Sequence, residues 1–495
     1  MTATLYGAPE GYDALLLAQR RREHRGSVLH VCRDDSRMAR LAEALAFFAP
    51  EVEVVRFPAW DCLPYDRVSP NPEIVSERVA TLARLVEPSG KKPRIVLTTV
   101  NALVQRVPPR EAFEGATLSL RAGGTADPEA VIRFLEANGY NRTGTVMEPG
   151  EYASRGGILD LFPAGEPAPV RLDLFGDQIE SIRRFDPASQ RSTDRLQALT
   201  LRPVSEVPLD PASISRFREG YRELFGPGAA EDPLYVSVSE GHRHPGLEHW
   251  VPLFHERMET LLDYLPDPAA SLDHQAEEAL AARLEMIADH YDARRAPARE
   301  GETPYRPLPP GRLYLDQAQW DAMLAPAQPV QFSPYSKPAG AAGADAGGRP
   351  GTVFTKAGGQ IGSGVFDQLR EQATAWAGQK DTNPKDTKPK DGGKRLVVAA
   401  WTRGSRERLQ HMLHENGFRA EAAESWAACL ALPAPVVPVV VLGLERGFVG
   451  GPSEDGAAIV GEQDLLGERI SRPPRRRKRA DEFIAEATEL AEGDL

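Results

Sequence analysis

The sequence contains few cysteines and no long apolar run. Its 495 residues include 3 cysteines, Cys32, Cys62 and Cys429, which lie far apart and form no CxxC pair. Neither a disulfide framework nor a zinc ribbon is therefore indicated, and a reducing cytoplasm is the expected compartment. No apolar run reaches membrane-spanning length and no basic residue precedes Arg20, so the sequence predicts neither a membrane segment nor a secretion signal.

An excess of positive charge is also absent. The chain has 59 Lys and Arg against 71 Asp and Glu, which gives a net charge of −12. Such a chain does not coat nucleic acid through its overall field, so any DNA contact must come from a local patch. The dense basic cluster comprises Arg475, Arg476, Arg477, Lys478 and Arg479. It either contacts DNA phosphates or stays solvated in a linker, and the second interpretation is favoured.

A chain of this length is too long for one hydrophobic core and predicts three or four domains. In its first part, β-branched apolar runs at Val28–Cys32, Val52–Phe57 and Arg94–Thr98 alternate with helical patterns at Ser36–Phe48 and Glu73–Leu85. This alternation predicts a parallel sheet with helices packed on it.

The composition changes further along the chain. Residues 336–393 are dominated by Gly, Ala, Pro, Asp and Lys and predict a flexible linker, with a short helix at Val365–Ala377. After this linker, buried-strand patterns at Leu396–Ala400 and Val436–Leu442 flank a helical pattern at Ser405–Asn416. These patterns predict a small α/β domain.

Two strand-forming stretches, Glu151–Pro163 and Arg171–Asp186, are the most informative part of the sequence. Alternate residues of a strand share a face, so the second stretch has a leucine face and an opposite face with charged and aromatic residues. The leucines expected in a core are Leu172 and Leu174, and the residues of the opposite face are Arg171, Asp173 and Phe175.

Arg171 and Phe175, with Arg155 of the preceding strand, indicate a recognition surface, because arginine and aromatic residues dominate protein interface hot spots. Arg155 stands just before the Gly156-Gly157 bend. The alternative is a phenylalanine buried under a neighbouring element, with two solvated arginines. The alternation by itself leaves both interpretations open.

The same stretch resembles the small β-rich domain 2 shared by the excision-repair protein UvrB and the bacterial transcription-repair coupling factors. Further segments resemble the coupling factors in the same order along the chain: Phe57–Asp66, Asn71–Arg78, Ile95–Arg106, His249–Phe254, Leu442–Phe448 and Asp464–Arg469. The resemblance implies an α/β multidomain protein. A degenerate P-loop NTPase-like, UvrB-like parallel-sheet domain would contain an inserted small β-rich domain and be followed by a small separate α/β domain.

The domains that the resemblance implies are domain 1a without a Walker A loop (1–110), domain 2 (111–205), domain 1b, which completes domain 1 (206–335), the linker (336–393), domain 3 (394–468) and a basic linker (469–495). In the family, a polymerase-binding domain and a DNA-translocating motor follow. The resemblance therefore predicts that this chain is a truncated or split form, or an isolated domain region.

A nucleotide-driven motor needs a Gly-rich loop that ends in Gly-Lys-Ser/Thr, because backbone N–H groups, lysine and hydroxyl hold the phosphates and magnesium. The corresponding stretch Gly7–Asp13 has no lysine, serine or threonine, and Gly90-Lys91 and Gly393-Lys394 are followed by Lys and Arg. We therefore expect no ATP hydrolysis, no catalytic residue and no cofactor, with ATP used only by the motor of the full-length family. The few residues between Tyr65 and Glu73 also leave no room for the DNA-clamping hairpin of UvrB.

By resemblance, domain 2 binds UvrA, and the family's contacts fall on Arg155, Arg171 and Phe175. The implied function is a non-catalytic adaptor that recruits UvrA to stalled transcription complexes in nucleotide excision repair. RNA polymerase and DNA would be bound only through domains that this chain lacks. The alternatives are an α/β enzyme that binds a nucleotide in an unrecognised mode and a nonfunctional remnant of a split gene.

Four histidines, His242, His244, His249 and His255, lie close together in the sequence and raise the question of a metal site. No H-E-x-x-H pattern or cysteine partner accompanies them. A solvated loop followed by a packed helix is the favoured interpretation, and no metal is expected.

Overall fold

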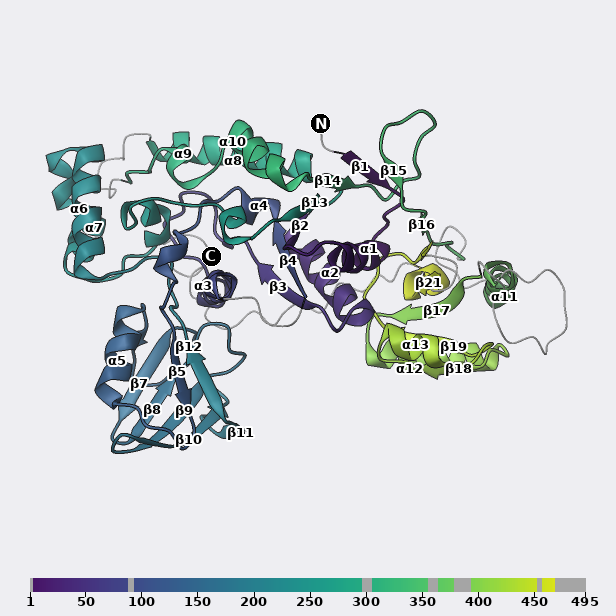
Figure 1. The fold of residues 1–495 in the computed structure, drawn as a ribbon, viewed down its shortest axis with the longest axis horizontal. Helices are drawn as coiled ribbons and strands as arrows, with labels where there is room; N and C mark the ends of the chain where they lie inside the picture. The colour runs from purple at the N-terminus through teal and green to yellow at the C-terminus, as the bar shows by residue number, and fades with distance from the viewer. Residues whose placement is uncertain are drawn as a thin grey trace, which may run out of the picture. The chain divides into compact units, whose positions relative to one another are not determined.

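The computed structural model describes residues 3–87, 93–295, 305–354, 364–377, 393–451 and 456–467 (Figure 1). The chain divides into two compact units. The first comprises residues 1–349 with 425–427, and the second comprises residues 350–424 with 428–495. No helix in the described ranges is long and apolar enough to cross a membrane.

The first unit is built on a seven-stranded sheet of order β15-β1-β14-β13-β2-β4-β3, whose paired strands are parallel. Strands β13 and β14 follow the inserted domain in sequence and lie between β1 and β2, so the segments before and after the insertion form one sheet. The strands are β1 (Ala3–Tyr6), β2 (Val28–Cys32), β3 (Glu53–Phe57), β4 (Arg94–Thr99), β13 (Ala269–Leu272), β14 (Val330–Phe332) and β15 (Ala344–Asp345).

Local sequence signals start the main helices of this unit. The Asp34 side chain accepts a hydrogen bond from the Arg37 N–H at 2.7 Å and caps α2, and Asn71 with Pro72 begins α3 in the same manner. The α-helices are α1 (Tyr12–Glu23), α2 (Asp35–Phe48), α3 (Pro72–Val86), α4 (Val100–Leu103), α6 (Pro211–Phe225), α7 (Pro233–Ser239), α8 (Ala276–Arg295), α9 (Pro310–Leu313) and α10 (Gln317–Leu324). Short 3-10 helices are η1 (Arg110–Ala112), η2 (Pro227–Glu231), η3 (Leu247–Leu253), η4 (Leu261–Tyr264) and η5 (Ala325–Ala327).

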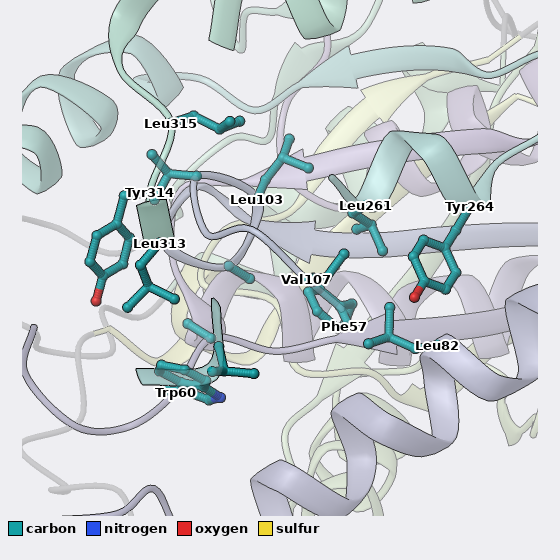
Figure 2. Close-up of a cluster of buried hydrophobic side chains, with 14 of the residues drawn as sticks. Phe57, Trp60, Leu82, Leu103, Val107, Leu261, Tyr264, Leu313, Tyr314 and Leu315 are labelled. Carbon is teal, nitrogen blue, oxygen red and sulfur yellow. The ribbon is translucent and has the colours of Figure 1, made fainter. Parts of the chain in front are cut away.

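The core of this unit is shared by residues from both sides of the insertion. Figure 2 shows Leu82 and Val107, which precede the inserted domain, in one cluster with Leu261, Tyr264 and Leu313, which follow it. Burial of this apolar surface is the main force that holds the two segments together.

The inserted domain, residues 118–201, has its own sheet and core. Its six strands have the order β11-β10-β9-β8-β7-β6, and β5 pairs with β12 separately. Helix α5 (Pro128–Ala137) contributes Val131 and Leu135 to a core with Leu159, Leu172 and Ile182. The strands are β5 (Leu118–Arg121), β6 (Asn141–Arg142), β7 (Glu151–Arg155), β8 (Ile158–Leu161), β9 (Val170–Phe175), β10 (Gln178–Phe185), β11 (Ser192–Leu196) and β12 (Ala198–Leu201).

A buried ion pair ties the segment that follows the inserted domain to helix α3. The Arg78 Nε atom lies 2.6 Å from Glu206 Oε1, both side chains are inaccessible to solvent, and the guanidinium lies 4.3 Å from the Phe57 ring centroid. Two further hydrogen bonds join the parts, from the Gly165 N–H to Ser76 Oγ at 3.2 Å and from Arg202 to Glu87 at 2.9 Å. These contacts attach the inserted domain to domain 1.

The second unit has a six-stranded sheet of order β16-β20-β21-β17-β19-β18 and a core that includes Val398, Val439, Leu409 and Leu413. Its strands are β16 (Arg349–Pro350), β17 (Arg395–Ala400), β18 (Ala420–Ala422), β19 (Val437–Val441), β20 (Phe448–Gly450) and β21 (Ala457–Gly461). The helices are α11 (Val365–Trp376), α12 (Arg403–Glu415), α13 (Trp426–Ala431) and α14 (Glu462–Leu466). The molecule is thus α/β and multidomain, as the sequence predicts.

Residues 336–393 differ from the flexible linker that their composition predicts, wherever the structure describes them. Strands β15 and β16 add to the edges of the two sheets, and Phe354 is buried. The short helix predicted at Val365–Ala377 is present as α11, which buries Val365 and Leu369. Edge strands are held by backbone hydrogen bonds, which do not need apolar side chains. The polar stretch 381–391 lies outside the described residues.

Candidate functional site

One face of the inserted domain's sheet carries the residues that the sequence singles out. Strand β8 pairs with β7 and β9, and β9 pairs with β10, in antiparallel register. Leu172 and Leu174 point to the core, as the alternation predicts, and Arg171, Asp173 and Phe175 point away from it. The register brings residues of four strands onto this outer face: Ala153, Arg155, Ile158, Asp160, Arg171, Asp173, Phe175, Gln178, Ser181 and Arg183.

Phe175 is the most exposed large apolar side chain of the described residues, with 75% of its surface accessible. The neighbouring bend explains this exposure. The Leu174 N–H donates to the Gly157 carbonyl oxygen at 2.7 Å, and a Cβ atom on Gly157 would lie 2.5 Å from the Leu174 carbonyl oxygen. Only glycine fits there, and Gly156 has a φ of 60°. The bend therefore presents no side chain that covers Phe175, and the interpretation as a buried phenylalanine is wrong.

Arg171 is held in place by a carboxylate of the neighbouring strand. Its Nε and Nη2 atoms donate to the two oxygens of Asp160 at 2.7 and 2.8 Å, and its guanidinium lies 4.9 Å from the Phe185 ring centroid. Asp160 is only 5% exposed, and its hydrogen bond raises the pKa of Arg171. The predicted arginine is thus preorganised in a bidentate, charge-assisted pair rather than freely solvated.

Arg155 has a different environment. Its side chain is exposed and donates to the Gly144 carbonyl oxygen and, at 3.3 Å, to the Thr145 hydroxyl. Within the described ranges, no carboxylate forms a salt bridge with it. Arg155 lies opposite Ile158, which lies opposite Asp173, so strand β8 separates Arg155 from Arg171 and Phe175. The three predicted residues share one face but do not contact one another.

Sequence reasoning placed Asp173 on this face but missed its partners, and it missed Asp160. Asp160 pairs with Arg171, and Asp173 pairs with Arg183 and accepts a hydrogen bond from Ser181. The period-2 alternation of polar residues in β8 and β10 was a signal for their orientation, but the pairing depends on a register that the sequence does not specify. Ile158, 39% exposed, was also missed. The predicted phosphate-contacting cluster, Arg475 to Arg479, lies outside the described residues.

The loop between β1 and α1 lies at the carboxyl edge of the seven-stranded sheet, where P-loop folds bind phosphates. Here the Gly11 N–H donates to Asp13 Oδ1 at 3.0 Å, and the Asp13 carboxylate pairs with Arg37. The Arg37 Nε atom also lies 3.5 Å from Asp273 Oδ2, and all three charged side chains are buried. We call Asp13, Arg37 and Asp273 the closed edge.

Backbone groups of the same loop are also engaged by the chain itself. The N–H groups of Gly7 and Ala8 donate to the carbonyl oxygens of Tyr335 and Ser333, each at 2.8 Å. The Gly348 N–H donates in turn to the Gly7 carbonyl oxygen at 3.0 Å. In a Walker loop such N–H groups face the nucleotide phosphates, whereas here those of Gly7 and Ala8 bind protein oxygens.

The histidines do not converge on one point. His249 is buried with its Nε2 atom 4.0 Å from Cys62 Sγ, and the His255 ring lies 2.9 Å from the Glu206 carbonyl oxygen. His242 and His244 are exposed or partly exposed. Burial raises the pKa of Cys62 to about 12, which opposes formation of the thiolate that binds metals. In the parts of the chain that the structure describes, no group of three potential metal ligands is found.

Comparison with known proteins finds family models that match two parts of the chain. Residues 118–206 match the model of the UvrB interaction domain, and residues 390–465 match the model of the MFD D3 domain. The chain is 31% identical to the transcription-repair-coupling factor of Escherichia coli over 96% of its length, and 30% identical to that of Haemophilus influenzae over 98%. It is 28% identical to that of Myxococcus xanthus over 100%.

The chain spans about 40% of the length of these relatives, with 39% for Escherichia coli, 40% for Haemophilus influenzae and 41% for Myxococcus xanthus. Both matched domains occur in the order that the sequence resemblance implies, with the UvrB interaction domain before the D3 domain. The comparisons thus confirm that the chain is similar to the amino-terminal, UvrB-like region of the transcription-repair coupling factors, followed by their domain 3.

Proposed function

We propose that this chain acts as a non-catalytic adaptor that recruits UvrA during transcription-coupled nucleotide excision repair. The observation that carries the proposal is Phe175, an uncovered aromatic side chain in a domain that matches the UvrB interaction domain. An exposed aromatic residue beside arginines has the composition of an interface hot spot. The contacts would fall on Arg155, Arg171 and Phe175.

The proposal assigns no catalysis to this chain. Support comes from the closed edge, where the Asp13 carboxylate and the Arg37 guanidinium occupy the region that a nucleotide's phosphates and their counter-charges take in P-loop enzymes. RNA polymerase, DNA and ATP would belong to parts of the longer relatives that this chain does not span. A titration with ATP that gives saturable binding would favour the alternative, a nucleotide-binding enzyme.

The direct test is calorimetric titration of the chain with purified UvrA. Phe175→Ala removes an exposed ring without disturbing the core, and we expect it to cost about 2 kcal/mol of binding free energy, a loss of roughly 30-fold. Val236→Ala is the matched control, because Val236 of α7 is an exposed apolar residue outside the inserted domain. Equal affinities of the wild type and Phe175→Ala would contradict the proposal.

Arg171→Ala needs a second measurement. It leaves the nearly buried Asp160 carboxylate without its partner, so lost binding would also follow from a destabilised sheet. The double variant Asp160→Asn with Arg171→Gln removes both charges and keeps groups that hydrogen bond. If this variant folds as the wild type does and binds UvrA weakly, the guanidinium itself contributes to the contact.

A further inference from the structure

The outer face changes in character along its strands. At one end, Val146, Ala153, Phe162 and Phe185 form a small buried cluster. In the middle lie the two paired charges, Arg171 with Asp160 and Arg183 with Asp173. At the other end, next to the two hairpin bends, the exposed side chains are Arg155, Ile158, Phe175 and Gln178.

The register places Ile158 and Phe175 next to each other on this face. Ile158 lies directly opposite Asp173, and Phe175 is two residues further along the same strand, so the two apolar residues form a diagonal cross-strand pair. Diagonal neighbours are about 7–8 Å apart and remain within reach when one of them is aromatic. On the other side of Phe175, strand β10 places the exposed Gln178 directly opposite it. The Gly156-Gly157 bend adds no side chain next to Phe175.

The charges of the face are distributed unevenly around this pair. Arg171 and Arg183 are each neutralised by a carboxylate of the face itself. Arg155, directly opposite Ile158, bonds only to neutral oxygens of Gly144 and Thr145 among the described residues. The end of the face is therefore an apolar pair bordered by Gln178 and by one cation, Arg155, for which the described part of the chain provides no counter-ion.

From this arrangement we propose that Ile158 is a fourth contact residue, forming one apolar anchor with Phe175, and that UvrA receives this anchor in an apolar recess bordered by a carboxylate that meets Arg155. The inference rests on the proposed function and specifies its chemistry. An apolar recess on UvrA would cover the exposed surfaces of both side chains. A carboxylate on UvrA would supply a negative counter-charge for the Arg155 guanidinium. Arg171, paired with Asp160, lies on the same face beside this anchor.

The test is a double-mutant cycle on UvrA affinity with Ile158→Ala, Phe175→Ala and the combined variant. Ile158→Ala is expected to weaken binding about fivefold, in keeping with the smaller apolar area that it removes. If both side chains enter one recess, the combined loss will differ from the product of the single losses. Ile158→Val, which keeps the β-branched shape, should lose less, and Val236→Ala should bind as the wild type does.

The charge is tested by measuring the same affinities at low and high salt. Arg155→Ala should weaken binding at low salt and reduce the salt dependence, because it removes the cation that meets the carboxylate of UvrA. If the affinity of Arg155→Ala for UvrA depends on salt as strongly as that of the wild type, the proposed contact between Arg155 and a carboxylate of UvrA is wrong. An Ile158→Ala affinity within about twofold of the wild type would overturn the contact.

The outcomes separate the inference from the proposed function. If the folded wild-type chain does not bind UvrA, the proposed function and the inference both fail. If the wild type binds and Phe175→Ala weakens binding while Ile158→Ala does not, the proposed function stands and only the shared apolar anchor fails. Circular dichroism of each variant verifies that the inserted domain is folded, since Ile158 is partly exposed and its truncation leaves the core residue Leu159 in place.

Discussion

The closed edge of the first sheet and the outer face of the inserted domain treat charge in opposite ways. At the closed edge, Asp13, Arg37 and Asp273 are buried and neutralise one another. On the outer face, the arginines of the ion pairs stay partly exposed, and Phe175 and Arg155 are left for contact. The position that binds a small ligand in P-loop enzymes is filled by the chain's own side chains, whereas one surface of the inserted domain's sheet, suited to a protein partner, stays exposed.

The largest effect is expected from opening the closed edge. Arg37→Met leaves the buried Asp13 carboxylate without its counter-ion, which should reduce the free energy of unfolding by about 3–5 kcal/mol. Urea denaturation measures it. Arg56→Met is the control, because Arg56 pairs with Glu77 at the surface and should cost less than about 1 kcal/mol. Similar losses for both variants would mean that the closed edge does not stabilise the fold.

A second prediction concerns pH and the buried histidines of the first unit. Burial lowers the pKa of His30 and of His249 to about 4. The unfolded chain, with histidine pKa values near 6.5, takes up protons first, so stability is complete above pH 6.5 and falls as the pH drops toward 4. The loss should reach about 3 kcal/mol for each histidine.

His30→Gln removes one titration and should flatten the dependence of unfolding free energy on pH between these values. The slope is measured by urea denaturation at a series of pH values, with His242→Gln, at an exposed position, as the control. The inserted domain has no histidine between residues 118 and 206, so its stability should vary less in this range. A wild-type slope in His30→Gln would contradict the prediction.

A third prediction concerns the bend that exposes Phe175. Gly157→Ala places a Cβ atom against the Leu174 carbonyl oxygen and should cost about 1–3 kcal/mol through overpacking. Faster hydrogen exchange of the β8 and β9 amides would report it. Gly144→Ala is the matched control, since a Cβ atom there meets no heavy atom within 4 Å. If the amide exchange rates in Gly157→Ala equal those of the wild type, the strands accommodate the added Cβ atom without loss of stability, and the prediction is wrong.

The smallest effect on stability is expected from Arg155→Ala. The side chain is exposed and its two bonds go to neutral oxygens, so the free energy of unfolding should change by less than about 0.5 kcal/mol. Thermal unfolding measures this change. A large destabilisation would identify Arg155 as a structural residue that holds the loop around Gly144. It would weaken the assignment of Arg155 as a contact residue of the outer face.

Local patterns in the sequence predict much of the fold. The helical patterns at Ser36–Phe48 and Glu73–Leu85 agree with α2 and α3 to within a residue or so at each end. The alternation that separates Leu172 from Arg171 is also confirmed. These features depend on neighbours three, four or two residues apart, so the sequence reports them directly.

Long-range pairing could not be predicted in the same way. The contact between Asp13 and Arg37, and that between Asp160 and Arg171, depend on which strands and helices become neighbours in space. The insertion of β13 and β14 between β1 and β2 has no local signal either. Strand β15 was missed because Ala344–Asp345 lies in a Gly- and Ala-rich stretch, where edge pairing depends on backbone groups alone.

The strand order of the first sheet has a consequence for how the chain folds during synthesis. Ala3 of β1 pairs with Val330 of β14, and Leu5 pairs with Ala344 of β15. Strand β1 therefore cannot pair until most of the first unit has been synthesised. Strands β5 to β12 pair with one another and can assemble earlier. Distant pairings are slow to form, and domains tend to fold as units. The inserted domain, with its outer face, should therefore fold before the seven-stranded sheet is complete.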